Sequence, residues 1–593
     1  MSPQDILEKY YGYTEFRPGQ KQIIDHVMQG RNTLAIMPTG GGKSLCYQIP
    51  ALLLNGLTLV ISPLISLMKD QVDSLTQSGV QAGFINSSQD WQQTTHILQQ
   101  ARNKKLQLLY IAPERLEQTG FMEVLQELNV ALVAIDEAHC ISQWGHDFRK
   151  SYLNLSDILP QIKSQPTIIA LTATATQQVA TDIMRRLNIS PDNEIKTGFA
   201  RPNIVFKVVK GQNKNNFILK YVKANINSAG IIYTATRKKA EQISTMLIKA
   251  GVRAAVYHAG LPEEVRRKNQ GNFLFDRLSL IVATNAFGMG IDKSNVHYII
   301  HAQAPGSLEA YYQEAGRAGR DGSEAEAILL YSAADMQIQR MFAEKSDADQ
   351  QHKDVIYHNI QSMVDYANTQ RCLQQFIVGY FGQTMPPCKK CSNCTDDRKA
   401  TDITITTQKI LSCVMRMHQR YGKKLVAQVL AGSKAKRVKE LGLTSLSTYG
   451  ILHTFKAQQV EEVIDYLTAS GYLTMLDPQY PTLHLTTLGE KVLRGHEQVA
   501  RKITVINSHS ANSEDSALFE RLRVLRYEIA EKQGVPPYVI FSDKTLHEMC
   551  QVLPEDLPGM LQIKGVGQQR LNKYGQKFLT ALQTYRADQA KIV

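Results

Sequence analysis

Short apolar runs recur along the first third of the chain, each followed by polar or glycine-rich residues and then by a helical stretch. Between residues 30 and 200 these runs are Thr33–Met37, Thr58–Ile61, Leu106–Ile111, Val130–Ile135 and Thr167–Leu171. Continuous apolar runs of this length are typical of strands that are buried on both faces of a parallel sheet. The pattern therefore predicts an α/β lobe in this part of the chain.

The same alternation returns between residues 228 and 331. The apolar runs here are Gly230–Tyr233, Val252–Tyr257, Leu280–Ala283, Val296–Ile300 and Ala327–Tyr331. A second α/β lobe follows from this repetition, and we expect the two lobes to be joined near residues 198–215.

Beyond about residue 340 the strand–helix alternation stops. Residues 340–380 are predicted to be helical, and residues 403–505 to form a small helical domain that closes with a hairpin. The polar stretch 507–516 is predicted to be a flexible linker before a second helical unit. The expected divisions are 1–200, 201–338, 339–400, 401–506, the linker 507–516, and 517–593.

Length, charge and composition limit the class of protein. A chain of 593 residues is too long for one core and implies three to five domains at roughly 100–200 residues each. Its formal net charge of +13 favours a polyanionic partner. The chain has no run of about 18 apolar residues that could span a membrane, and its first residues do not resemble an export signal. Its eight cysteines are too few for a disulfide framework. We expect a soluble intracellular protein with no membrane partner.

A glycine-rich segment, Met37–Ser44, follows the first predicted strand and precedes a helical stretch. Consecutive glycines allow backbone N–H groups to converge on phosphate oxygens at a helix amino terminus. Lys43 is expected to reach the β- and γ-phosphates of a nucleotide, and the Ser44 hydroxyl to bind Mg²⁺. Met37 stands where the strict phosphate-loop pattern has its first glycine, so a plain strand–helix turn is the alternative. The residues expected to hold nucleotide here are Thr39, Gly40, Gly41, Gly42, Lys43 and Ser44.

Two adjacent carboxylates, Asp136 and Glu137, stand at the carboxyl end of the most apolar predicted strand. Ligands collect at this edge of open α/β sheets. We assign Asp136 to Mg²⁺, through water, and Glu137 to the water that attacks the phosphate. The alternative is a pair of solvated carboxylates that cap a helix.

The second lobe contributes the segment Gln313–Arg320. Arg317 and Arg320 lie three residues apart with glycines between them, so both can point into a cleft between the lobes. Phosphoryl transfer needs cations where charge accumulates on the phosphates, and Gln313 completes the expected catalytic set. A basic turn on the surface is the alternative.

These blocks, in this order, resemble superfamily 2 helicases, and more narrowly RecQ-type DNA helicases. Residues 11–20 resemble the RecQ adenine-reading motif, and the resemblance implies that Gln20 pairs with the base while Tyr13 and Arg17 flank it. The segments 62–69, 171–176, 257–260 and 283–292 match further helicase motifs. The resemblance extends over nearly the whole chain.

Residues 140–149 are similar to the aromatic-rich loop that couples DNA binding to ATP hydrolysis in RecQ enzymes. Trp144, one of only two tryptophans, lies there among polar residues. An exposed ring on such a loop can stack on a base, with Arg149 adding a phosphate or stacking contact. The alternative is that Trp144 and Phe148 only pack the loop against the sheet.

Four cysteines follow the spacing C-x₁₅-C-x₂-C-x₂-C: Cys372, Cys388, Cys391 and Cys394. Four thiolates suit tetrahedral Zn²⁺ and leave no open position for catalysis. We predict a closed structural zinc site, and the resemblance to RecQ proteins implies the same metal. An iron–sulfur cluster is the alternative. The other four cysteines are scattered and are expected to have no role.

Residues 429–440 open with a Gly-Ser helix-cap signal and carry four cations within six residues. A solvated basic face is the ordinary interpretation of such a stretch. The resemblance to the RecQ winged-helix domain instead implies that Ser433, Lys434, Lys436 and Arg437 meet duplex phosphates. Residues 472–486 are predicted to be the hairpin wing, with Tyr480 as the candidate at its tip.

Residues 517–585 resemble the HRDC domain. The turn Ile563–Gly567 is either a helix–hairpin–helix turn that offers backbone donors to a phosphate or a plain connection between helices. The fold class implied by the resemblance is α/β: two RecA-like lobes, a zinc-binding helical subdomain, a winged-helix domain and an all-α HRDC domain.

The function implied by the resemblance is that of an ATP- and Mg²⁺-dependent, zinc-containing DNA helicase that moves 3′ to 5′. Single-stranded and duplex DNA are the expected partners, with single-strand-binding protein as a further one. By the same likeness the chain is a monomer in the cytoplasm at the nucleoid, acting in recombination, repair, replication and the SOS response. An RNA helicase and a DNA-binding scaffold with a vestigial ATPase are the two alternatives.

Overall fold

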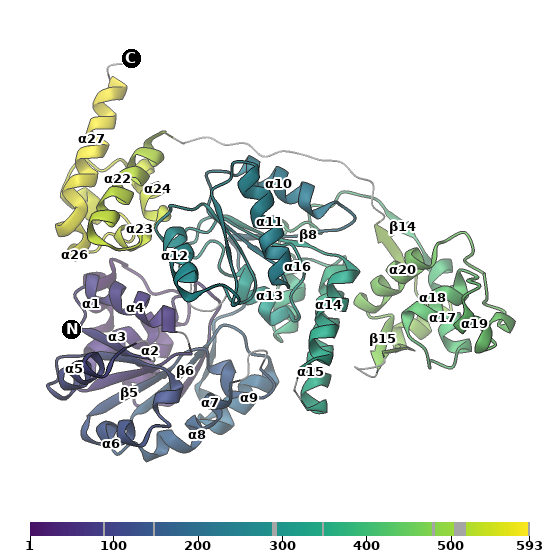
Figure 1. Ribbon diagram of the computed structural model, residues 1–593, viewed down its shortest axis with the longest axis horizontal. Coiled ribbons are helices and arrows are strands. Elements are labelled where there is room, and N and C mark those ends of the chain that lie inside the picture. The colour runs from purple at the N-terminus through teal and green to yellow at the C-terminus, as the bar shows by residue number, and fades with distance from the viewer. Residues whose placement is uncertain are drawn as a thin grey trace.

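The computed structural model describes residues 1–63, 65–86, 89–145, 149–287, 293–346, 349–476, 481–502 and 517–590. Two α/β lobes form the centre of the molecule, with further helical bodies on either side (Figure 1). No helix in these ranges is long and apolar enough to cross a membrane.

Lobe 1 is built on a seven-stranded parallel sheet in the order β3-β4-β2-β5-β6-β1-β7. Its strands are β1 (Thr33–Ile36), β2 (Leu57–Ile61), β3 (Ala82–Ile85), β4 (Leu108–Ile111), β5 (Val130–Ile135), β6 (Thr167–Thr172) and β7 (Glu194–Lys196). The helices are α1 (Pro3–Ile6), α2 (Gln20–Met28), α3 (Leu45–Leu53), α4 (Ile65–Gln77), α5 (Trp91–Arg102), α6 (Thr119–Glu127), α7 (Lys150–Leu153), α8 (Leu155–Ile158) and α9 (Gln177–Arg186). All five predicted strands are confirmed. The two that the sequence analysis did not predict, β3 and β7, lie at the two margins of the sheet, where they are only partly buried.

Lobe 2 contains a six-stranded parallel sheet in the order β10-β11-β9-β12-β13-β8. Its strands are β8 (Ile204–Val209), β9 (Gly230–Tyr233), β10 (Ala254–Tyr257), β11 (Leu280–Ala283), β12 (Tyr298–His301) and β13 (Ala325–Leu330). Its helices are α10 (Lys214–Ala224), α11 (Arg237–Lys249), α12 (Glu263–Leu274) and α13 (Leu308–Ala315).

The expected joint at 198–215 was too long. Strand β8 lies inside that range and pairs along its whole length with β13, so only residues 197–203 pass between the two sheets. Lys207 divides the apolar residues of β8 into two short pieces, 204–206 and 208–209, so the sequence shows no continuous apolar run there.

Three helices follow lobe 2: α14 (Ala333–Glu344), α15 (Gln350–Asn368) and α16 (Leu373–Tyr380). They confirm the predicted helical stretch. Buried side chains of these helices, such as Ile360 and Leu373, belong to the same hydrophobic core as lobe 2 residues such as Phe206 and Tyr311, and so does the buried Cys391 that follows α16. The Tyr366 hydroxyl of α15 donates to the Tyr311 hydroxyl of α13 over 3.3 Å, so this subdomain packs as an extension of lobe 2.

The winged-helix region has a separate hydrophobic core. It comprises β14 (Ala400–Asp402), α17 (Thr404–Arg416), α18 (Lys423–Leu430), α19 (Lys436–Glu440), α20 (Ala457–Ala469), the hairpin β15 (Leu473–Leu476) and β16 (Thr482–Leu485), α21 (Thr487–Leu493) and β17 (Ala500–Lys502). The hairpin was predicted, but it does not close the domain. Helix α21 follows it, and β17 then returns to pair antiparallel with β14.

The carboxyl-terminal helical body also has a core of its own. Its helices are α22 (Ala517–Gln533), α23 (Pro537–Ile540), α24 (Asp543–Val552), α25 (Leu557–Leu561), α26 (Gln568–Arg570) and α27 (Gln576–Ala590). Figure 1 shows this body beside α1 of lobe 1 and α12 of lobe 2. The predicted linker 507–516 lies outside the described residues.

The turn Ile563–Gly567 fastens this body to lobe 1. The Gly565 N–H donates to the Gly12 carbonyl over 3.2 Å, and the two backbones approach so closely that a Cβ on Gly12 would lie 2.3 Å from the Gly567 nitrogen. The turn therefore contacts the segment that resembles the adenine-reading motif. The Gly565 N–H, one of the backbone donors considered for a phosphate, already donates to Gly12.

A buried ionic cluster fastens the same body to lobe 2. Arg526, which is fully buried, pairs with Asp543 at 2.7 Å, and the opposite oxygen of Asp543 lies 3.4 Å from His297 of lobe 2. Burial alone would lower the pKa of His297, but the Asp543 carboxylate outweighs it and the net pKa is raised. Protonated His297 therefore strengthens this contact, which weakens as the pH rises through the raised pKa.

We predict that Gly567→Leu releases the carboxyl-terminal body while leaving its fold intact. Gly567 has ordinary backbone angles, φ −79° and ψ 160°, and the atoms nearest to an added Cβ all belong to lobe 1, at 3.1 to 3.6 Å. Small-angle X-ray scattering should therefore show a larger radius of gyration. Lys577→Leu, on an exposed site of α27, is the control and should match the parent. An unchanged scattering profile for Gly567→Leu would contradict the docking.

Candidate nucleotide, zinc and DNA sites

The phosphate-loop segment lies between β1 and α3, at the carboxyl edge of the lobe 1 sheet. Gly40 and Gly42 have φ values of +79° and +80°, a region that favours glycine. A Cβ on Gly42 would lie 2.4 Å from the Gln20 side-chain nitrogen, and one on Gly41 would lie 2.9 Å from the Pro38 carbonyl oxygen. Only a run of glycines fits here, as a loop that wraps phosphate requires.

A cavity of about 370 Å³ opens above this loop and is lined by both lobes. The predicted nucleotide and catalytic residues that line it are Tyr13, Arg17, Gln20, Thr39, Gly40, Gly42, Lys43, Ser44, Asp136, Glu137, Gln313, Arg317 and Arg320. Gly41 is the one predicted member that does not line the cavity; it lies between two residues that do. Residues that are some 300 positions apart in the chain thus meet in one space.

The residues that resemble the adenine-reading motif contact the loop directly. The Gln20 amide donates to the Gly42 carbonyl over 3.0 Å, and its oxygen accepts from the Arg17 N–H at 2.8 Å. The Arg17 guanidinium donates to the Gly40 carbonyl. Tyr13 lies at the cavity wall with 39% of its surface exposed, so its ring is available to a ligand.

Asp136 and Glu137 follow β5 in the same parallel sheet. Glu137 has a φ of +49°, a strained conformation for a residue with a side chain, and its carboxylate lies 3.4 Å from the His139 ring. His139 in turn shares a 3.0 Å hydrogen bond with the Thr172 hydroxyl, within the predicted motif 171–176. Glu137 is therefore linked through His139 to the end of β6.

Lobe 2 reaches across the seam to these carboxylates. The Gln313 amide donates to Glu137 over 3.4 Å, and Arg317 is buried close by. Burial lowers the pKa of Arg317, the neighbouring Arg320 lowers it further, and the carboxylates of Glu314 and Glu137 only partly offset this shift. The site holds a buried guanidinium next to its acidic pair.

Lys43 is in a similar electrostatic position. Burial lowers its pKa, while Glu137 and Asp136 oppose the shift and Arg320 adds to it. The lysine ammonium donates to the Met37 carbonyl at a long 3.4 Å. A polyphosphate bound here would supply the negative charge that compensates these buried cations. Ser44 and Asp136, both on the cavity wall, are the residues that would hold a Mg²⁺ ion with it.

Sequence reasoning missed one residue at the seam, Arg201. Its guanidinium donates to the Thr39 carbonyl of the phosphate loop at 2.5 Å and to the Gly316 and Ala318 carbonyls of lobe 2 at 2.9 and 3.0 Å. Burial lowers its pKa to about 10. Arg201 lies in the short inter-lobe joint, and no motif marks it in the sequence, so only the folded structure reveals the contact.

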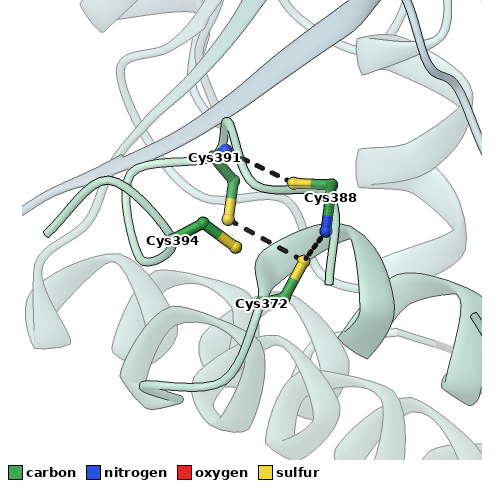
Figure 2. Close-up of side chains that lie close together, drawn as sticks. All are labelled: Cys372, Cys388, Cys391 and Cys394. Atoms are coloured by element: carbon green, nitrogen blue, oxygen red, sulfur yellow. Dashed lines mark hydrogen bonds between the residues drawn. The ribbon is translucent and has the colours of Figure 1, made fainter. Parts of the chain in front are cut away.

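The four clustered cysteines fit a tetrahedral zinc ion. Their sulfur atoms all lie within 4.8 Å of one another, and the Cys391 and Cys372 sulfurs are 3.9 Å apart (Figure 2). A tetrahedron with Zn–S bonds of about 2.3 Å has sulfur–sulfur edges of roughly 3.8 Å. Backbone N–H groups donate to these sulfurs, for example from Cys388 to Cys372 at 3.2 Å and from Leu373 to Cys391 at 3.3 Å. Such donors stabilise thiolates.

The aromatic-rich loop is only partly described. Trp144 is half-buried and packs partly against the lobe 1 core, while Phe148 lies outside the described residues. Arg149 donates to the Pro63 carbonyl over 3.2 Å, so the loop is tied to the carboxyl end of β2. Trp144 therefore packs partly against the core, as the packing alternative expects, and part of its surface stays exposed.

The predicted basic helix of the winged-helix region is shorter than expected. The Gly-Ser pair ends α18, because Gly432 adopts a φ of +71°, and α19 begins only after Ala435 with five residues. The Ser433 hydroxyl accepts from the Ala435 N–H at 3.3 Å. Lys434, Lys436 and Arg437 are all exposed, so the charged face exists without a long helix. The wing-tip candidate Tyr480 lies outside the described residues.

We predict one zinc ion per chain, and that Cys391→Ser loses it together with stability. Cys391 is fully buried in the core shared with lobe 2, so losing the metal should lower the apparent melting temperature by about 5 °C or more. Cys550→Ser, away from the cluster, is the control and should keep both metal and stability. Metal analysis that finds no zinc in the purified parent would contradict the assignment.

Comparison with known proteins agrees with this layout. Five family descriptions match successive parts of the chain: DEAD/DEAH box helicase at 17–183, helicase conserved C-terminal domain at 213–322, RecQ zinc-binding at 333–395, RQC domain at 397–510 and HRDC domain at 515–582. The chain is similar to the ATP-dependent DNA helicase RecQ of Bacillus subtilis (strain 168), with 50% identity over 584 residues and 98% of each chain covered. It is also similar to the protein of the same name from Haemophilus influenzae, with 40% identity over 595 residues that cover 98% of this chain and 96% of the other. The chain therefore belongs to the RecQ family of helicases.

Proposed function

We propose that this chain is an ATP-dependent DNA helicase that couples hydrolysis at the lobe seam to the separation of DNA strands in repair and recombination. The observation that carries the proposal is the shared cavity, in which Lys43, Glu137 and Arg320 come from segments that fold into two different lobes. Full-length similarity to DNA helicases of the RecQ family supports the same activity.

The cavity has groups for each part of phosphoryl transfer. Lys43 and the glycine loop bind the phosphates, and Arg317 and Arg320 stabilise the charge that develops on them. Glu137, held by Gln313 across the seam, orients the attacking water and accepts its proton. Ser44 and Asp136 are the residues that would hold Mg²⁺, which would supply positive charge to neutralise part of the phosphate charge.

Hydrolysis is coupled to motion because the cations of lobe 2 lose their partner when the phosphate leaves. Arg317 is then a buried charge with less compensation, which favours separation of the lobes. A DNA strand held by both lobes would be pulled by that movement. Trp144 and Arg149, on a loop tied to β2, are the proposed contacts for the single strand.

The duplex is proposed to lie on the winged-helix region. Ser433, Lys434 and Arg437 would contact its phosphates, which gives affinity without sequence readout, and Tyr480 is kept as the wing-tip proposal. Five further properties are proposed from family resemblance alone. They are movement in the 3′-to-5′ direction, a requirement for Mg²⁺, a monomeric state, binding to single-strand-binding protein and localisation at the nucleoid.

The test is ATP-driven unwinding of a 3′-tailed DNA duplex. Lys43→Ala should lower ATP turnover by roughly 10²–10³-fold and abolish unwinding, because it removes the main positive charge that contacts the β- and γ-phosphates. Lys163→Ala, at an exposed site of lobe 1, is the control and should match the parent.

Unwinding that persists in Lys43→Ala would overturn the mechanism. In parallel, single-stranded DNA and RNA should be compared as activators of ATP turnover. Stronger activation by RNA would favour an RNA helicase, and turnover that neither polymer changes would favour a scaffold with a vestigial ATPase.

A further inference from the structure

One of the two tryptophans stands in solvent. Trp91 is 79% exposed, although a tryptophan ring is a large apolar surface that folded proteins usually cover. The backbone beneath it is well held: the Asp90 carboxylate accepts from the Gln93 N–H at 2.7 Å, and the Gln93 side chain accepts from the Asp90 N–H at 3.4 Å. Trp91 is thus the first residue of α5, its backbone is fixed by the Asp90 cap, and its ring is exposed to solvent.

The surroundings of Trp91 argue against a protein-docking patch. Among the residues between 29 and 225 whose side-chain burial the structure describes, Trp91 is the one large apolar side chain that is exposed. Interfaces between proteins need a contiguous area with an apolar centre, which a lone ring does not provide. Its sequence neighbours Gln92 and Gln93 are exposed amides. A single flat ring among polar groups suits a flat ligand with polar edges.

The position of Trp91 at one edge of the lobe 1 sheet indicates which flat ligand would bind to it. All strands of lobe 1 are parallel, so the loops that follow them share one edge. Along this edge stand the Asp136 loop after β5, Pro63 after β2, Arg115 after β4, and Trp91 after the marginal strand β3.

Hydrogen bonds connect these loops. Arg115 donates to the Asn86 carbonyl after β3 over 3.0 Å, and Arg149, from the Trp144 loop, donates to the Pro63 carbonyl after β2. Strands β2 and β3 are two positions apart, or roughly 10 Å at about 4.8 Å per strand. At about 3.4 Å per stacked nucleotide, a strand held by the Trp144 loop reaches β3 within about three nucleotides.

We propose that Trp91 is a base-stacking site for single-stranded DNA, which extends the DNA track from the Trp144 loop to the margin of lobe 1. The proposal rests on the proposed function, since it takes the strand at the Trp144 loop as its starting point. Stacking tolerates any base because every base has a flat π-face, so the site would add affinity without sequence preference.

The presence of only two tryptophans allows a direct test. In Trp144→Phe, Trp91 is the sole tryptophan, and its fluorescence reports on its own surroundings. Titration with oligothymidylate should quench this emission, with oligomers of about ten nucleotides or more quenching more strongly than trimers. DNA binding is followed separately by the anisotropy of a labelled oligomer.

An affinity measurement covers the case in which Trp144→Phe binds DNA poorly. Trp91→Ala should weaken the binding of long oligothymidylate by about 5- to 100-fold, while Trp91→Phe should keep most of the affinity. Gln92→Ala, at the neighbouring exposed residue, is the matched control and should bind like the parent.

Parent-like affinity in Trp91→Ala would overturn the inference, as would Trp91 emission that stays constant while the anisotropy shows binding. Neither result touches the proposed function, which is tested by ATP-driven unwinding. Unwinding that persists in Lys43→Ala, together with intact quenching of Trp91 in Trp144→Phe, would overturn the proposed function and leave the stacking site standing.

Discussion

The seam between the lobes contains more positive charge than its own carboxylates neutralise, and the rest of the structure is arranged around this fact. Lys43, Arg201 and Arg317 are each partly or fully removed from water, and burial lowers the pKa of all three. Buried charges without full compensation are costly, so the closed seam is most stable with a polyanion inside it. The nucleotide is in this sense a structural part of the closed state, and its chemistry controls whether the lobes stay together.

The bodies outside the lobes act on this seam through their attachments. The zinc-binding subdomain shares a core with lobe 2, and the Gln374 amide donates to the Arg201 carbonyl over 2.7 Å, so it supports the residue that bridges the lobes. The HRDC body contacts Gly12 in lobe 1 and His297 in lobe 2, and therefore bridges the two lobes. The winged-helix region is joined to the zinc subdomain through Gln370 and Lys502, two hydrogen bonds of 3.1 Å each.

Much of the fold and of the site could be predicted from the sequence, because buried parallel strands and phosphate loops leave local patterns. Continuous apolar runs predicted β5 and β9 at their observed bounds, and the glycine loop, the acidic pair and the cysteine spacing each indicated a site whose residues the structure brings together. Strand β8 was not predicted because Lys207 interrupts its apolar residues. The Gly-Ser pair was interpreted as the start of a helix, although Gly432 ends one. Arg201 and the contact of Gly567 with Gly12 depend on segments far apart in the chain, and nothing local announces them.

The most direct test of the shared, charge-unbalanced seam is the distance between the lobes with and without nucleotide. Fluorescent labels on cysteines introduced at two exposed lysines, Lys163 in lobe 1 and Lys249 in lobe 2, would report it by energy transfer. A non-hydrolysable ATP analogue is expected to shift the population to one short distance, and Arg317→Ala is expected to remove this shift while the lobes remain folded. An inter-lobe distance that does not respond to the analogue, or that responds equally in Arg317→Ala, would contradict this expectation.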